Sequence, residues 1–143
     1  MEIDEIKKAL RKSATRFFTG GFRPTNSVEE SWIGKVSVFK KDEDVPIDEK
    51  GNKMLPLFQV FLPNLPLIPD ILKNIKLISV FISKDFPQEF EPMGKNWILR
   101  EYENIENLER RKLDISYSFI KPFPLKPELF KNDFPMWEDD GMT

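Results

Sequence analysis

Two strongly apolar runs near the middle of the chain, Met54–Leu62 and Leu77–Ile82, constrain the fold more than any other part of the sequence. Each run carries apolar side chains at both odd and even positions, so neither shows the alternation of a half-exposed strand. Strands that are apolar on both faces are typical of the interior of a covered sheet. We therefore predict that the two runs are neighbouring interior strands, with Leu77 and Phe81 on one face and Ile78, Val80 and Ile82 on the other.

Gln59 is the only polar residue at the centre of the first run. A buried amide that finds no hydrogen-bond partner costs about 1–3 kcal/mol. We expect neighbouring backbone groups to bond this side chain, in preference to a ligand.

Three further segments have the composition or alternation of strands, and they are Trp32–Lys40, Asn96–Tyr102 and Leu113–Ile120. Gly34 lies inside the first of them, where a glycine indicates a bulge or a close approach of another backbone. No regular helix separates these strands. The pattern therefore predicts a sheet core over residues 31–121, with about five mostly antiparallel strands.

The N-terminal segment Glu2–Phe18 has apolar residues at helical spacing, namely Ile3, Ile6, Leu10, Ala14 and Phe17. This spacing predicts an amphipathic helix within residues 1–20, ended by Gly20-Gly21. We also expect short helical segments at Pro69–Asn74 and within Glu103–Arg111.

From Pro122 onward, prolines punctuate the sequence at positions 122, 124, 127 and 135. We predict an irregular segment over residues 122–143, with a short helix at Pro127–Asn132 and a frayed end. Together with the preceding segments, this predicts a single α+β domain over residues 1–143: an N-terminal helix, a mostly antiparallel sheet and a Pro-rich irregular C-terminal segment.

The 143 residues include no histidine and no cysteine. The chain therefore cannot build a Ser-His-Asp or Cys-His arrangement, nor a zinc site of ordinary composition. No catalytic motif is recognisable, so the sequence favours a protein that is not an enzyme, and we assign no catalytic, cofactor-binding or metal-binding residues. Binding residues are not specified by the sequence either.

The net charge is −2 and the pI is near 5.4. Two basic clusters, Lys7-Lys8 and Arg110-Arg111-Lys112, have acidic residues beside them, and we interpret both as solvated surface. We therefore expect no nucleic acid as a partner. No run approaches the ~20 apolar residues that cross a bilayer, and the charged N-terminus does not resemble a signal peptide, so we expect a cytoplasmic protein without membrane contact.

The loop Lys41–Lys53 holds five acidic residues, Asp42, Glu43, Asp44, Asp48 and Glu49. Their spacing lacks the alternating oxygen ligands of an EF-hand loop. We predict a solvated loop and no metal site.

Four short motifs follow one another in a recognisable order: Ser31-Trp32-Ile33-Gly34, Pro46-Ile47-Asp48-Glu49-Lys50-Gly51, Leu57-Phe58-Gln59-Val60 and Val80-Phe81-Ile82. As an ordered set they resemble the YwqG-like family, a bacterial domain of unknown function, over roughly residues 31–102. The chain departs from the family at Lys35, where a second glycine usually stands, and members are commonly longer, with a second half related in layout to the first.

The resemblance implies a bacterial cytoplasmic protein, and it transfers no catalytic residues. Because some members are found near contact-dependent toxin systems, it also implies a protein-binding role of the immunity type. The leading hypothesis is thus a non-catalytic protein-binding module.

The alternative is a carboxylate-dependent hydrolase that acts on a carbohydrate or a similar small ligand. Its acids would be Glu101 together with Glu89 or Glu91, and Trp97 and Tyr102 would stack on the sugar. A third reading is a structural or regulatory domain with no ligand, and the sequence sets no oligomeric state for any of them.

Overall fold

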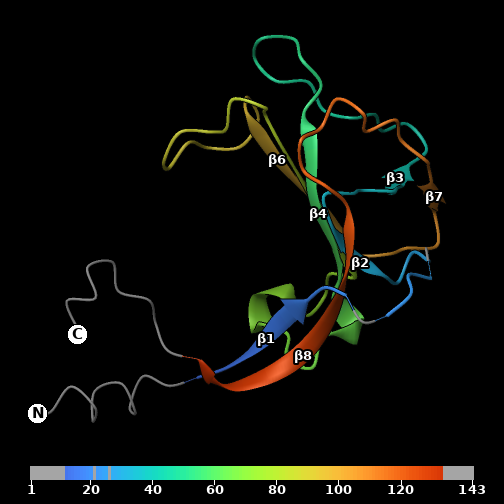
Figure 1. Ribbon diagram of the computed structural model, residues 1–143, viewed down its shortest axis with the longest axis vertical. Helices are drawn as coiled ribbons and strands as arrows, with labels where there is room; N and C mark the ends of the chain where they lie inside the picture. Colours follow the sequence, from blue (N-terminus) through green and yellow to red (C-terminus); the bar gives the residue numbers. More distant parts are fainter. Residues whose placement is uncertain (1–11, 21, 26, 134–143) are drawn as a thin grey trace, which may run out of the picture.

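A computed structural model of the protein describes residues 12–20, 22–25 and 27–133 (Figure 1). The strands are β1 Lys12–Phe18, β2 Ser31–Ile33, β3 Val38–Lys40, β4 Leu55–Phe61, β5 Leu77–Ile82, β6 Trp97–Tyr102, β7 Leu108–Arg110 and β8 Phe123–Asp133. Six of them form one sheet in the order β1-β8-β2-β4-β5-β6, and β3 pairs with β7 in a second sheet. Every pairing between these strands is antiparallel.

The two central strands confirm the prediction made from the apolar runs. β4 and β5 are neighbours, with Phe58 opposite Val80 and Val60 opposite Ile78. The register shifts between Pro56 and Phe58, so Leu57 is an extra residue in β4. Because a bulge restarts the alternation, Leu55 and Phe58 lie on the same face of the sheet.

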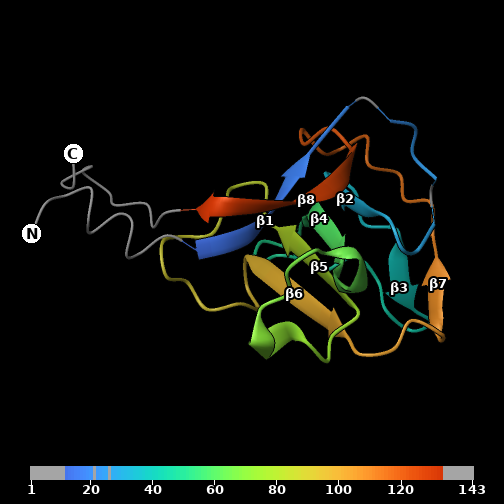
Figure 2. The same ribbon diagram turned by 90° about the horizontal axis from the view of Figure 1, so that it is seen from below.

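One face of the sheet is covered by β3 and β7, and we call it the covered face. Figure 2 shows this pair of strands set apart from β1 and β8. Two clusters of buried side chains fill the space between the two sheets: Val36, Phe39, Met54 and Phe81 in one, and Val38, Phe61, Leu77 and Tyr102 in the other. The covered face therefore holds most of the core.

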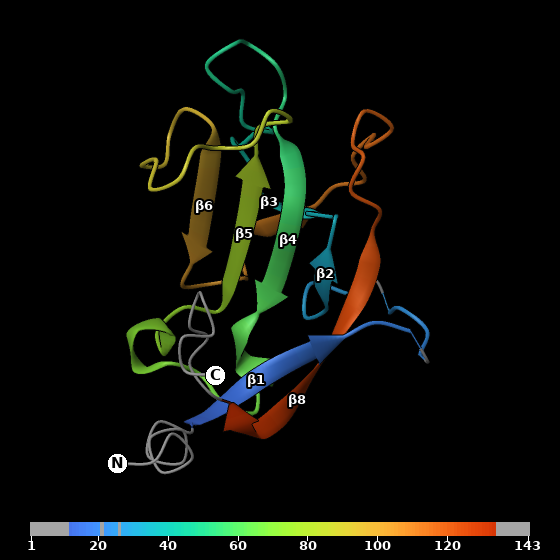
Figure 3. The same ribbon diagram turned by 60° about the vertical axis from the view of Figure 1, so that its left-hand side comes forward.

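The opposite face, which carries Phe58, Val60, Val80 and Ile82, is curved, and we call it the concave face (Figures 1 and 3). Val80 and Ile82 are buried there with Leu55, against partly buried neighbours that include Leu99 and Ile120. β1 crosses in front of one end of β4 and β5 (Figure 3). The expected shielding of the central strands is thus complete on the covered face and partial on the concave face.

The predicted strand Trp32–Lys40 is two strands, because the chain bends at Gly34. This glycine has φ +75°, a conformation that side chains disfavour, and its N–H donates to the Leu57 carbonyl at 2.7 Å. The backbone of Lys121 approaches it closely, as expected for a glycine inside a strand pattern. The bend sends β3 to the covered face, while β2 stays in the main sheet.

The predicted N-terminal helix is wrong for the residues that the structure describes. Residues 12–18 form β1, which pairs with β8, and residues 1–11 lie outside the described part. Thr15, Phe17 and Phe18 favour a strand, and Arg16 forms an ion pair with Glu128 on the paired strand. Pairing with a distant segment outweighs helical spacing here, so the fold is mostly β and not α+β.

The irregular C-terminal segment is also wrong, because Phe123–Asp133 is one long strand. Its first residues pair with β2 and the rest pair with β1. Pro124 and Pro127 each have a paired strand on one side only, so a missing N–H need not interrupt the sheet. The short helix expected at 127–132 is absent from this strand, and residues 134–143 lie outside the described part.

The strand predicted at Leu113–Ile120 is a loop. Side chains bond the backbone locally: Asp114 accepts from the Ser116 N–H at 3.0 Å, and Ser118 from the Ile120 N–H at 3.1 Å. Such turns compete with strand pairing. The short helix expected at Pro69–Asn74 is the 3₁₀ helix η2 Asp70–Leu72, and the helical turn expected within Glu103–Arg111 is replaced by a loop that leads into β7. A second 3₁₀ helix, η1 Leu62–Asn64, was not predicted.

Candidate functional site

An apolar groove on the concave face is the candidate binding site of the described chain. It consists of two adjoining cavities of about 720 and 440 Å³, which share Phe17, Phe58 and Val60. The larger cavity is lined further by Phe18, Thr19, Ile33 and Leu125, and the smaller by Ala14, Thr15, Leu62, Leu65, Leu67, Pro69, Leu72 and Ile78. None of the described residues that line either cavity carries a charge.

Strand pairing positions the groove. β1 and β8 turn across one end of β4 and β5 (Figure 3), and side chains from five strands, β1, β2, β4, β5 and β8, line the groove. Thr15 joins β1 to the connector that lines the smaller cavity. Its hydroxyl donates to the Leu67 carbonyl at 2.7 Å and accepts from the Leu67 N–H at 3.2 Å. These two bonds hold the 65–72 connector against β1.

Several groove side chains are open to solvent. Phe18 and Ile33 are each 37% exposed, and Leu67 is 39% exposed. Apolar surface that stays in water on a well-packed sheet is typical of a binding site when it is contiguous and not scattered. The groove meets this condition because its residues line two cavities with a shared wall.

The loop between β5 and β6 adds exposed aromatic surface above the open side of the concave face (Figure 1). Phe90 is 94% exposed and Phe86 is 57% exposed, and both have positive φ, 62° and 59°. A bulky residue in this conformation is strained unless its surroundings hold it, and such strain concentrates at functional loops. Phe86 packs edge-on against Phe119, with the ring centroids 5.7 Å apart.

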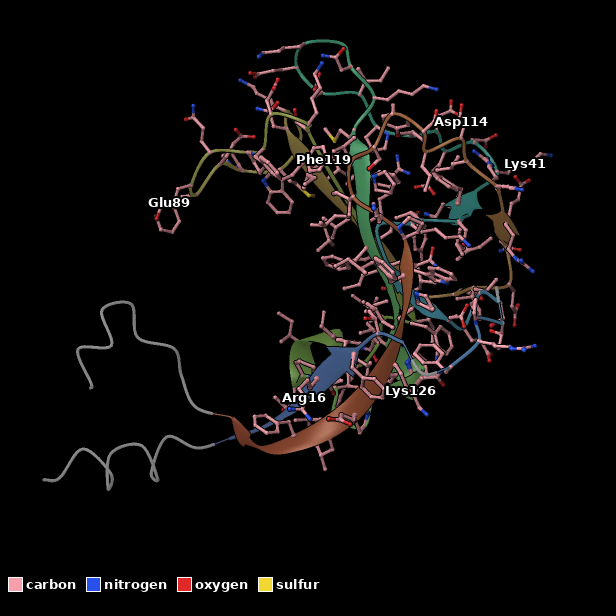
Figure 4. The ribbon with its side chains drawn as sticks, in the orientation of Figure 1. Arg16, Lys41, Glu89, Asp114, Phe119 and Lys126 are labelled. Atoms are coloured by element: carbon pink, nitrogen blue, oxygen red, sulfur yellow. The ribbon has the colours of Figure 1, made fainter. Side chains whose placement is uncertain are left out.

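The structure does not bring together the carboxylates that the hydrolase hypothesis named. Glu91 lies in the loop that precedes β6, where its carboxylate accepts from the Asn96 amide at 3.1 Å, and Glu101 lies near the end of that strand. Glu101 is five positions further along the chain than Asn96, roughly 17 Å at the usual rise of a strand. Glu89 lies on the loop, away from the strands (Figure 4).

Glu101 instead shares a cleft of about 540 Å³ with Glu103, Lys40 and Lys41. Both carboxylates are exposed, so neither has the water-excluded environment that separates an acid from a base in a catalytic pair. The aromatic groups named for sugar stacking are otherwise engaged: Trp97 donates to the Glu91 carbonyl at 2.7 Å, and Tyr102 is buried and donates to Glu43 at 2.8 Å.

Three acids of the 41–53 loop have structural contacts, and one of them, Asp44, pairs with Arg111 at 3.8 Å. Glu43 joins the loop to β6: its carboxylate accepts from the Tyr102 hydroxyl and forms an ion pair with the Arg100 guanidinium at 3.6 Å. Asp48 is buried, and it accepts from the backbone N–H groups of Lys50 and Asn52 and from the Ser83 hydroxyl. Within residues 12–133, gaps aside, no group of three or more acidic side chains is placed to hold a metal ion.

Gln59 is bonded as expected. It is fully buried, accepts from the Ser37 N–H at 2.9 Å and donates to the Glu30 carbonyl at 3.4 Å. Both partners are backbone groups, so this amide links β4 to the segments on either side of β2 and is not directed at a ligand.

The groove residues of β1 and β8 were not identified from the sequence. Phe17 was assigned to a helix and Leu125 to an irregular segment. A signal was present in the period-two spacing of Phe123, Leu125, Pro127 and Leu129, which is the pattern of a strand with one apolar face. The prolines within that stretch obscured it.

Comparison of the chain with protein-family models gives no match, and comparison with curated proteins gives none either. The resemblance to the YwqG-like family therefore stays a prediction. Among the helices of the described residues, none is long and apolar enough to cross a membrane.

Proposed function

We propose that the protein is a non-catalytic protein-binding module, and that its groove binds an apolar segment of a partner protein. The observation that carries this proposal is the uncharged groove itself, built from side chains of β1, β2, β4, β5 and β8 and of the 62–72 connector. A ligand that lies there loses contact with water and gains no ion pair from the lining. The complementary chemistry is a run of aliphatic or aromatic side chains.

The shape of the groove supports a peptide segment over a compact small molecule. Two joined cavities form an elongated hollow that can accept successive side chains, and the exposed Phe90 and Phe86 stand on the loop above the open side. Aromatic side chains are enriched among residues that contribute most to protein–protein binding. The partner is therefore expected to reach from the groove toward this loop.

A peptide selection with the full chain tests the proposal. A displayed library of random peptides is selected against the wild-type protein, and the enriched peptides are titrated by fluorescence anisotropy. We expect them to be rich in apolar residues. Leu67→Lys and Ile33→Lys each place a charge in the lining at an exposed position, and we expect each to weaken binding at least about tenfold, or about 1.4 kcal/mol.

Ile71→Lys is the matched control, because Ile71 is 86% exposed and lies outside the groove lining. We expect this variant to bind the same peptides as the wild type does. Circular dichroism and thermal unfolding establish that all three variants fold. Peptides that bind all four proteins equally, or a wild-type protein that enriches no apolar peptides, would contradict the proposed site.

An immunity-type role in the bacterial cytoplasm is the finer form of this proposal. It is supported by the resemblance to the YwqG-like family and by the overall net charge of −2, which suits association with a basic partner. Protection of cells from a toxin encoded beside the gene, lost in the Leu67→Lys variant, is the result that this form predicts.

A further inference from the structure

A second surface depression, here called the basic cleft, lies beside β3 and β7. Its volume is about 580 Å³, and the described residues that line it are Lys35, Ser37, Arg110, Arg111 and Lys112. Four of the five are cationic and none is acidic. In a chain with a net charge of −2, this is a strong local departure from the overall composition.

Backbone pairing assembles the cleft from two distant segments. The Arg111 N–H donates to the Ser37 carbonyl at 2.7 Å, which continues the β3–β7 pairing of Val38 with Arg110. Lys35 comes from the bend after Gly34, and its ammonium lies 4.0 Å from the centre of the Trp32 ring. The basic cluster 110–112, interpreted from the sequence as solvated surface, is thus one wall of a cleft whose other wall is also basic.

The cationic side chains of the cleft differ in the partners that they already have within the protein. Arg111 is turned toward the 40–44 loop, where it donates to the Lys41 carbonyl at 2.8 Å and pairs with Glu109 at 3.3 Å. Arg110 and Lys112 form no ion pair with any acid in the described part of the chain. Two exposed cations therefore remain available to an anion from outside.

Like charges held together repel one another, and an anion between them removes that repulsion. The pKa of Lys35 is lowered by burial and by the positive charges of Arg110 and Lys112, while Glu30 acts in the opposite direction. The charges of the two walls thus act on one another across the cleft.

We propose that the basic cleft binds the phosphate group of a small phosphorylated molecule. The guanidinium of Arg110 has the planar pair of donors that matches phosphate oxygens, and Lys112 and Lys35 supply two further positive charges. Ser37 lines the cleft on the side of Lys35, and its hydroxyl is a neutral hydrogen-bond donor. A group with two or more negative charges matches this set better than a single carboxylate does. The site lies beside β3 and β7, away from the groove, so it is independent of the proposed peptide site (Figure 2).

The test is a titration of the full chain with inorganic phosphate and with pyrophosphate. Binding is measured by calorimetry and by the shifts of amide NMR signals. Pyrophosphate is expected to bind more tightly than phosphate, with the largest shifts at Ser37 and at residues 110–112. Affinity should fall as salt is added, because the contacts are between exposed charges. The double variant Arg110→Gln/Lys112→Gln is expected to lose about tenfold or more in affinity.

The double variant Arg23→Gln/Lys95→Gln is the matched control, since it removes the same charge from two exposed residues outside the cleft. It is expected to bind pyrophosphate as the wild type does. Three results would overturn the proposal: no saturable pyrophosphate binding, an equal loss of affinity in the control variant, or equal affinity for citrate, a carboxylate of similar charge. If pyrophosphate does not bind but a phosphoserine peptide does, the first of these results holds and the ligand is a modified protein.

Discussion

A Cβ atom on Gly34 would lie less than 3.0 Å from the backbone carbonyl oxygen of Lys121. The segment that leads into β8 therefore rests directly on the bend that follows β2. This contact sets where β8 begins its pairing with β2, and hence where Leu125 reaches the groove. A residue with no side chain is required at this one position for two reasons, the contact and the positive φ of 75°.

Gly34→Ala is expected to destabilise the protein by about 2–5 kcal/mol, the sum of a strained left-handed residue and an overpacked contact with backbone. The free energy of unfolding from urea titration measures the effect. Gly51→Ala is the control, because Gly51 has φ +84° but has open space where its Cβ would lie. It should cost only about 1 kcal/mol. Equal losses in the two variants would show that the contact with Lys121 is unimportant.

Gln59→Leu is expected to cost about 1–3 kcal/mol, because the half-buried Ser37 N–H loses its acceptor while the apolar volume is kept. Chemical denaturation of the variant gives the value. Asn64→Leu is the comparison: Asn64 is exposed and donates to the Glu29 carbonyl at 3.0 Å, a bond that water can replace. A loss at Asn64 as large as the loss at Gln59 would contradict the role assigned to burial.

The sequence predicts β4 and β5 correctly because both strands are apolar at odd and even positions, and it predicts β6, which is only partly buried, from its content of apolar and aromatic residues. Phe81, for example, is fully buried and sits between two paired strands, so only an apolar residue fits. β1 and β8 were missed because the pairing of Arg16 with Glu128 joins residues 112 positions apart. No local sequence pattern encodes that contact. The apolar spacing near Phe17 is compatible with a helix, and it is equally compatible with a strand that pairs with a distant segment.

The candidate groove could not be predicted for the same reason. Phe58 and Val60 were identified as central, but the groove exists only because Phe17 and Leu125 are brought to them by β1 and β8. The basic cleft also depends on the pairing of segments that are distant in the sequence. Arg110-Arg111-Lys112 is visible in the sequence, whereas its position opposite Lys35 depends on the pairing of β3 with β7.

Asp48 makes stability depend on pH in the acid range. The Asn52 N–H, with the Ser83 hydroxyl and the Lys50 N–H, lowers the pKa of this carboxyl below its usual value of about 3.9, although burial opposes them. A carboxyl whose pKa is lower in the folded state stabilises it above the usual pKa, and the contribution is lost as pH falls through the folded value. The melting temperatures of wild type and Asp48→Asn should therefore differ most above about pH 5 and converge on acidification. A constant difference down to pH 2 would contradict this role.

Tyr102 is expected to act at the opposite end of the pH scale. Burial, together with the hydrogen bond to Glu43 and the negative charge of that residue, raises the pKa of its hydroxyl to about 12. Because this pKa is higher in the folded state, the contribution to stability is complete below about pH 10 and is lost as pH rises through about 12. Between about pH 10 and pH 12, the free energy of unfolding should therefore fall less in Tyr102→Phe than in the wild type.

The ionisation itself can be followed by ultraviolet absorbance in Tyr117→Phe, where Tyr102 is the single remaining tyrosine of the two in the chain. Its midpoint is expected near 12 while the chain is folded, and Glu43→Gln should lower it, because the variant removes the negative charge that opposes ionisation. The reciprocal variant Tyr102→Phe leaves Tyr117, whose pKa is also raised, mainly by burial. A midpoint near 10 for Tyr102 in the folded protein would mean that its hydroxyl is open to water, and that the 40–44 loop is not held against β6 through Glu43.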